Sequence, residues 1–172
     1  NKLKKTKVIV FISVFTCIVL FLSGTLTIGR EIYSNGKYRQ YSESQVECAE
    51  AVEESTLTDA LFITGHQHLN EIAALAGRNI YAGSTIYVFF HGLDYTGRYE
   101  QIAKIYEDAQ ASPAILEEIG ADYIYISSYE RNDFLLDYDL YDYYPLVYSS
   151  GNIDILAVSA RAIENGTIFK ED

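Results

Sequence analysis

The stretch that decides the fold is ALFITGHQHLNEIAALAGRNI, from Ala60 to Ile80. Ala60 to Ile63 is a short apolar run with the length of a buried strand, and Thr64-Gly65 interrupts it. Apolar spacing from Asn70 to Ala76 predicts a helix, which ends at Gly77 because glycine tolerates the left-handed conformation. An extended segment restarts directly afterwards. The stretch therefore predicts strand, tight turn, helix and strand, in the manner of an α/β protein.

In α/β proteins, ligands bind at the turn after the carboxyl end of a strand, where backbone N–H groups and a helix N-terminus converge. The turn here contains His66 and His68, two of only three histidines in the chain. The third, His91, follows the run Ser84 to Phe90, whose composition fits either a strand or a short helix. If that run is a parallel strand, all three imidazoles lie at one edge of the sheet.

Three interpretations of this histidine edge stay open. Three imidazoles near a carboxylate can hold Zn²⁺ or another transition metal, although the spacing matches no named metal signature. Alternatively, the polar side chains bind a sugar or phosphate, or they only cap the helix and satisfy loop carbonyls. We predict no metal ligands and no cofactor. The ligand-binding candidates are Thr64, Gly65, His66, Gln67, His68, His91, Asp94, Tyr129 and Glu130.

A separate segment predicts a membrane location. Val8 to Ile28 is 21 residues without a charge, and as a helix it is about 31 Å long, enough to cross a bilayer's hydrocarbon core. No small-residue cleavage pattern follows it, so we expect a transmembrane helix over 1–30, with a cleaved signal peptide as the alternative. Four lysines precede the apolar run, which predicts a cytoplasmic N-terminus and an extracytoplasmic location for everything after Arg30.

The rest of the chain is strongly acidic. Five of the thirteen basic residues lie at or before Arg30, which leaves eight against 24 acids and a net charge of −16 for residues 31–172. Such a surface repels nucleic acid and anionic lipid headgroups, so we expect no nucleic-acid partner. Cys48 is the only cysteine after the apolar run, so no internal disulfide is expected.

Later segments complete the predicted domain. Ser112 is expected to cap a helix that has Pro113 at its first position and ends at Gly120, and Asp122 to Ser127 is the clearest strand in the protein. Two apolar segments, Pro145 to Tyr148 and Ile153 to Val158, flank a turn at 149–152 and predict a β-hairpin. Between them, Glu130 to Tyr144 is acidic and rich in tyrosine, which suits carbohydrate stacking, a protein interface or a solvated loop. We expect a connector and helix over 31–57, then a three-layer α/β domain over 58–172 with a mostly parallel sheet.

Three motifs carry a family resemblance: TGHQH at Thr64 to His68, ALAGR at Ala74 to Arg78, and HGLDY at His91 to Tyr95. They resemble the C-terminal extracytoplasmic domain of bacterial polytopic membrane proteins that look like integral-membrane glycosyltransferases of the GT-C type. The likeness covers residues 58 to 158. It departs from the family pattern at His66, where an Asp is expected, and at Leu69, where an Asn is expected.

The resemblance implies a parent protein that transfers sugar from a lipid-phosphate-linked donor. In that superfamily the acidic catalytic residues belong to an early extracytoplasmic loop, so this domain is expected to cover the membrane site or hold a glycan acceptor. The chain begins at Asn1 and contains no methionine, so we expect it to be part of a larger polytopic chain. Two other functions stay open: a structural or interaction domain of another polytopic membrane protein, and a membrane-anchored metal-dependent enzyme.

Overall fold

The computed structural model describes residues 2–33 and 39–165, and the chain divides into two units, 1–40 and 41–172. The first unit contains helix α1 (Lys2–Tyr33). Its segment Lys5–Tyr33 is long and apolar enough to cross a membrane, and no part of its most apolar window is buried by protein. This agrees with the predicted span as far as length and composition go.

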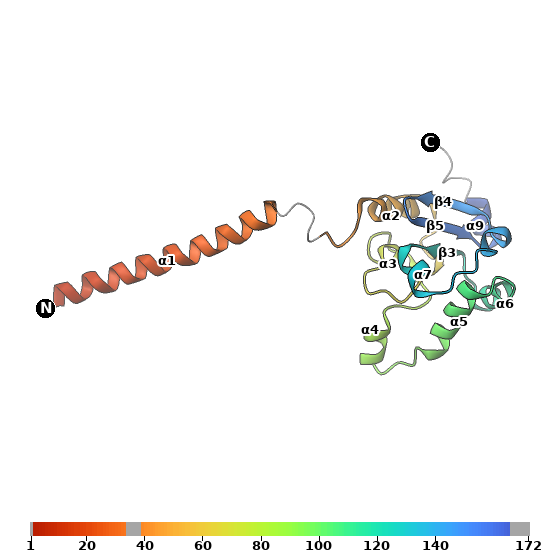
Figure 1. Cartoon of the computed structure of the whole chain (residues 1–172), viewed down its shortest axis with the longest axis horizontal. Helices are drawn as coiled ribbons and strands as arrows, with labels where there is room; N and C mark the ends of the chain where they lie inside the picture. Colours follow the sequence, from red (N-terminus) through yellow and green to blue (C-terminus); the bar gives the residue numbers. More distant parts are fainter. Residues whose placement is uncertain (1, 34–38, 166–172) are drawn as a thin grey trace. The chain divides into compact units, whose positions relative to one another are not determined.

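The second unit is built on a five-stranded sheet (Figure 1). Its strands are β1 (Leu61–Ile63), β2 (Asn79–Ile80), β3 (Tyr123–Ile126), β4 (Leu146–Ser150) and β5 (Ile153–Ala157), in the spatial order β2-β1-β3-β5-β4. β1 is parallel to both β2 and β3, whereas β5 is antiparallel to β3 and β4. Four strands therefore share one direction and only β5 opposes them, which confirms the mostly parallel sheet and the C-terminal hairpin.

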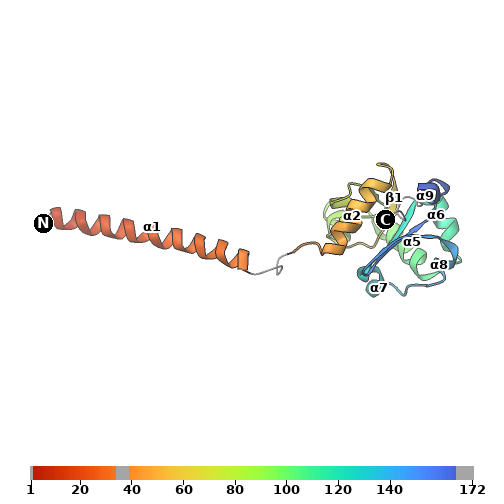
Figure 2. The same cartoon turned by 90° about the horizontal axis from the view of Figure 1, so that it is seen from above.

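Helices occupy both faces of this sheet, so the unit has three layers. They are α2 (Glu43–Ser55), α3 (Glu71–Ala74), α4 (Thr85–Phe90), α5 (Thr96–Glu107), α6 (Ser112–Ile119), α7 (Ser128–Asp133), α8 (Leu140–Tyr143) and α9 (Ala160–Asn165). Because alternate strand residues point to opposite faces, Phe62 and Tyr123 pack with α2, whereas Ile63 and Ile124 pack with α5 and α6. Figure 2 shows α2 and the α5–α6 pair on opposite sides of the sheet.

Local sequence signals explain most of these boundaries. Ser42 caps α2 in a reciprocal capping box with Gln45, and Gly120 ends α6 with positive φ, as predicted. Gly77 also has positive φ, but α3 is shorter than the predicted helix and ends at Ala74, three residues before it.

The sequence groups α2 with a connector before residue 58. In the structure α2 contributes Cys48, Ala49 and Val52 to the core, so it is part of the compact unit that begins at Tyr41.

One local prediction needs correction, and one open alternative is decided by the structure. Ser112 does not cap α6: its hydroxyl donates to the carbonyl of Ala109 at 2.9 Å, and the N-cap position belongs to Ala111. The run Ser84 to Phe90, compatible with strand or helix by composition, forms helix α4 and no strand. The premise that His91 follows a parallel strand is therefore wrong.

Candidate functional site

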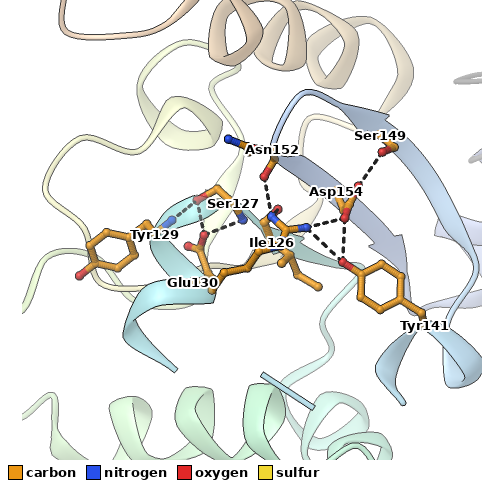
Figure 3. A network of polar contacts seen from close by, with 9 residues as sticks. Ile126, Ser127, Tyr129, Glu130, Tyr141, Ser149, Asn152 and Asp154 are labelled. Carbon is orange, nitrogen blue, oxygen red and sulfur yellow. Dashed lines mark hydrogen bonds and ion pairs between the residues drawn. The ribbon is translucent and has the colours of Figure 1, made fainter. Parts of the chain in front are cut away.

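The turn after β1 is joined to the turn after β3 by one buried carboxylate, that of Glu130 in α7. Its Oε1 accepts a hydrogen bond from the Gly65 amide at 2.9 Å, and its Oε2 accepts one from the Ser127 amide at 2.8 Å. The Ser127 hydroxyl also donates to Oε2, so Ser127 and Glu130 form a capping box at the start of α7 (Figure 3). The Glu130 side chain thereby links the carboxyl ends of two neighbouring parallel strands.

Burial raises the pKa of the Glu130 carboxyl, and the hydrogen bonds from Ser127 and Gly65 oppose that shift. These bonds account for both oxygens, so we assign Glu130 the role of fixing the two turns. It is not placed to contact a ligand.

Gly65 is required in this turn because the chain packs closely there. A Cβ at this position would lie 2.8 and 2.9 Å from two ring carbons of Tyr129, and 3.0 Å from Glu130 Oε1. Real Cβ atoms do not approach other atoms so closely. The glycine therefore lets the Tyr129 ring lie directly over the turn.

His66 is the centre of a partly exposed group that we call the His66 cluster, made of His66, Tyr99, Tyr129 and Asp133. The Tyr129 hydroxyl lies 3.3 Å from His66 Nε2, and Asp133 Oδ2 lies 3.5 Å from His66 Nδ1. The Tyr99 ring contacts the imidazole edge-on, with centroids 4.7 Å apart. α5 and α7 thus each place a tyrosine against the histidine that follows β1.

Electrostatics keep both phenols of the His66 cluster in their protonated form at neutral pH. Burial, followed by the charges of Asp133 and Glu130, raises the pKa of Tyr129 to about 12. Burial and the charge of Asp133 also raise the pKa of Tyr99. Both phenols therefore remain protonated and can donate to oxygen acceptors on a ligand. The His66 Nδ1 atom is buried and has no hydrogen-bond partner within the described part of the chain.

The other predicted candidates are divided between two places. His68 Nε2 lies 3.0 Å from the Tyr87 hydroxyl, so it contacts α4. Thr64 is buried and donates to the Gly65 carbonyl, while the Gln67 Nε2 atom is buried without a partner among the described residues. The turn thus keeps Thr64 through His68 together.

His91 and Asp94 do not join that turn. His91 is exposed at the C-terminal end of α4, and no hydrogen bond, ion pair or ring contact links its side chain to another described residue. The Asp94 carboxylate accepts a bond from the Thr96 amide at 2.9 Å, which lowers its pKa. It therefore orders the loop before α5.

Sequence reasoning missed a second buried polar group beside this turn. Glu71 is fully buried in α3, and its Oε1 accepts a hydrogen bond from the Tyr125 hydroxyl. Burial and the charge of Glu71 raise the pKa of Tyr125 and also raise that of the Cys48 thiol to about 12. Glu71 Oε2 and Asn70 Nδ2 are buried with no partner in the described ranges. An acidic residue in a first helical turn normally faces solvent, so nothing in the sequence signals this burial.

In residues 2–33 and 39–165, no three His, Cys, Asp or Glu side chains come together as a possible metal-binding group. In the acidic loop after α7, one carboxylate bonds to backbone amides. Asp137 accepts bonds from the amides of Ala109 and Asp139 at 2.9 and 3.1 Å.

Next to the site, Arg131 of α7 fastens the hairpin to β3. Its guanidinium donates to the Asn152 carbonyl and to Asp154 Oδ2, both at 2.5 Å, and Tyr141 and Ser149 also donate to Asp154 at 2.7 Å (Figure 3). The ion pair neutralises Asp154, so we assign this network the role of positioning α7.

A cavity of about 440 Å³ lies at the opposite end of β3, beside α6. Its walls are largely apolar, and Asp122 and Arg161 line one side. These two residues bond to each other, and Asp122 also accepts bonds from the Leu61 amide and the Ser159 hydroxyl. Their polar groups hold β1, β3 and α9 together, so we assign no ligand to this cavity.

Comparison with known protein families and with curated proteins found no match for this chain.

Proposed function

We propose that this protein is the C-terminal accessory domain of a membrane glycosyltransferase-like protein that uses a lipid-phosphate-linked sugar. In this proposal α1 crosses the cell membrane, the residues after Arg30 lie outside the cytoplasm, and the His66 cluster holds a glycan acceptor beside the membrane site. The family resemblance of the three motifs supports the class of parent protein.

The observation that carries the ligand assignment is the His66 cluster itself. Two protonated tyrosines and an imidazole stand partly exposed at the carboxyl ends of parallel strands, and a buried carboxylate fixes the backbone beneath them. Phenol rings provide an apolar face for a sugar ring and a hydroxyl for its oxygens. The net charge of −16 after Arg30 disfavours free anions, so a neutral sugar suits this surface better than a phosphate.

The test uses the full chain in phosphatidylcholine nanodiscs and a set of neutral trisaccharides: maltotriose, mannotriose and chitotriose. Binding is measured by saturation-transfer NMR. We expect at least one trisaccharide to bind and inorganic phosphate not to compete. Tyr129→Phe removes only a hydroxyl, and a net hydrogen bond contributes about 0.5–1.5 kcal/mol, so affinity should fall roughly twofold to tenfold.

Tyr138→Phe is the matched control, because Tyr138 is 65% exposed and lies outside the His66 cluster. It should bind the same trisaccharide as tightly as the unmodified chain. The proposal is wrong if no trisaccharide binds, or if Tyr129→Phe and Tyr138→Phe bind equally well.

A further inference from the structure

Helix α4 exposes large apolar side chains over its whole length. None of its six described residues is buried. Five side chains on α4 and the turn after it are between 50% and 78% exposed: Ile86, Tyr87, Phe89, Phe90 and Leu93. We call these five residues the α4 surface. Single exposed apolar residues are ordinary, but a contiguous group of this kind marks an interaction site. Figure 1 shows α4 at the periphery of its unit, away from the sheet.

The α4 surface is also free of charge in a unit that is otherwise acidic. No Asp, Glu, Lys or Arg occurs between Asn79 and Leu93, whereas residues 31–172 carry a net charge of −16. Phenylalanine, isoleucine and leucine with a tyrosine are the residues that enter the boundary between lipid headgroups and acyl chains. The composition therefore favours a lipid interface over a charged protein partner.

α4 contacts the candidate site through Tyr87, and the segment that precedes α4 is tied to α5. The Tyr87 hydroxyl lies 3.0 Å from His68 Nε2, and the two rings contact each other with centroids 4.9 Å apart. Arg98 of α5 donates to the Tyr81 carbonyl at 2.9 Å, and its guanidinium lies over the Tyr81 ring. Whatever the α4 surface binds is therefore held next to the turn at His66 to His68.

The chain length between the two units bounds their separation. α1 ends at Tyr33 and α2 begins at Glu43, so nine residues connect them. At about 3.3–3.6 Å per residue they span roughly 30 Å at most. A unit of this size has a radius of gyration of about 14 Å. A membrane-crossing α1 therefore keeps the second unit within about its own diameter of the bilayer, where the α4 surface can reach lipid.

We propose that the α4 surface inserts into the headgroup–acyl boundary of the bilayer that α1 crosses. This inference rests on the membrane placement in the proposed function. Insertion puts the His66 turn at the level of the headgroups, where the sugar of a lipid-linked donor is presented. Because the unit is acidic, apolar burial provides the attraction, and zwitterionic lipid is preferred to anionic lipid.

The chain contains no tryptophan, so a single introduced indole reports its own surroundings. The full chain carrying Phe90→Trp is reconstituted in phosphatidylcholine vesicles, with and without phosphatidylcholine brominated near the headgroup end of its acyl chains. We expect emission at short wavelength, quenching by the bromolipid and protection from aqueous iodide. Replacing part of the phosphatidylcholine by phosphatidylglycerol should weaken the bromolipid quenching.

Leu135→Trp is the control, since Leu135 is 84% exposed between α7 and α8. It should emit at the solvent wavelength, be quenched by iodide and be insensitive to bromolipid. Ile86→Trp, at another exposed position of the α4 surface, should repeat the Phe90→Trp result. Far-ultraviolet circular dichroism checks that each variant is folded.

Solvent-like emission from both α4 variants overturns the inference. Short-wavelength emission without bromolipid quenching also overturns it, because a protein surface, such as a second copy of the chain, then covers α4. Extraction of the same vesicles with alkaline carbonate separates the two proposals. A chain that stays in the membrane without lipid contact at α4 refutes only this inference, whereas a chain that is extracted refutes the membrane placement as well.

Discussion

Gly65→Ala tests how the candidate site is built. The added Cβ would lie 2.8 and 2.9 Å from two carbons of the Tyr129 ring and 3.0 Å from Glu130 Oε1. Relief requires the ring to swing away or the turn to shift, and overpacking of this kind typically costs about 1–3 kcal/mol. A shift of the turn also lengthens the bond from the Gly65 amide to Glu130 Oε1, now 2.9 Å. We expect the free energy of unfolding to fall by about 2 kcal/mol and the contact between Tyr129 and His66 to be lost.

Gly97→Ala is the control, and it should raise the free energy of unfolding where Gly65→Ala lowers it. Gly97 lies in the first turn of α5, its φ is not positive, and a Cβ added there would have no neighbouring atom within 4 Å among the described residues. Alanine should stabilise this position by about 0.4–1 kcal/mol, because it restricts the unfolded chain and favours the helix.

The assay is urea unfolding of the full chain in dodecylmaltoside micelles, followed by near-ultraviolet circular dichroism. Fifteen of the sixteen tyrosines lie after residue 33, so the signal reports the α/β unit. A Gly65→Ala variant as stable as the unmodified chain, or one that binds trisaccharide normally, would refute the close packing described for this turn.

Three further predictions concern charge, core and orientation. Burial alone would raise the pKa of Asp122, but bonds from Arg161, Ser159 and the Leu61 amide lower it. The ionised Asp122 carboxylate therefore stabilises the fold above about pH 4, and this stabilisation is lost as the pH falls through the lowered pKa. Asp122→Asn should cost about 1.5–3 kcal/mol at pH 7 and progressively less as the pH falls below about 4, and a pH-independent difference in urea unfolding would contradict this. Ile124 is fully buried, so Ile124→Ala should lower the free energy of unfolding by about 2–5 kcal/mol. Asp139 is exposed, so Asp139→Ala should lower it by less than about 1 kcal/mol. Equal urea midpoints for the two variants would count against the core assignment. For orientation, protease added to intact spheroplasts should remove a C-terminal tag, and a tag that survives until the membrane is permeabilised would reverse the expected topology.

Local patterns in the sequence predicted the features that depend on neighbouring residues. The apolar run from Val8 to Ile28 predicted a helix long enough for a membrane because length and lack of charge suffice for that inference. Gly120 marked a helix end because glycine readily adopts the left-handed conformation of the cap. The α/β class and the closing hairpin followed from the order of apolar runs and turn residues.

Features that depend on distant residues required the tertiary structure. A short apolar run such as Ser84 to Phe90 has no periodicity that separates strand from helix, and it forms a helix with an exposed face. The prediction grouped His91 with His66 on the premise that the run before His91 is a parallel strand, and that run is a helix. The turn at Thr64 to His68 was found from sequence because it directly follows a strand.

Glu130 was predicted only as a ligand-binding candidate, and it shows why buried polar contacts between distant residues could not be predicted from the sequence. Its partner Gly65 is 65 residues away along the chain, and the two meet because β1 and β3 are adjacent parallel strands. Glu71 and Tyr125 meet 54 residues apart for the same reason. Their residue types carry no sign of burial, since a carboxylate is buried only when the folded chain supplies its hydrogen-bond donors. The sequence alone indicated where most strands and turns and the long apolar helix lie, whereas the pairing of strands decided which polar side chains are buried together and which remain exposed.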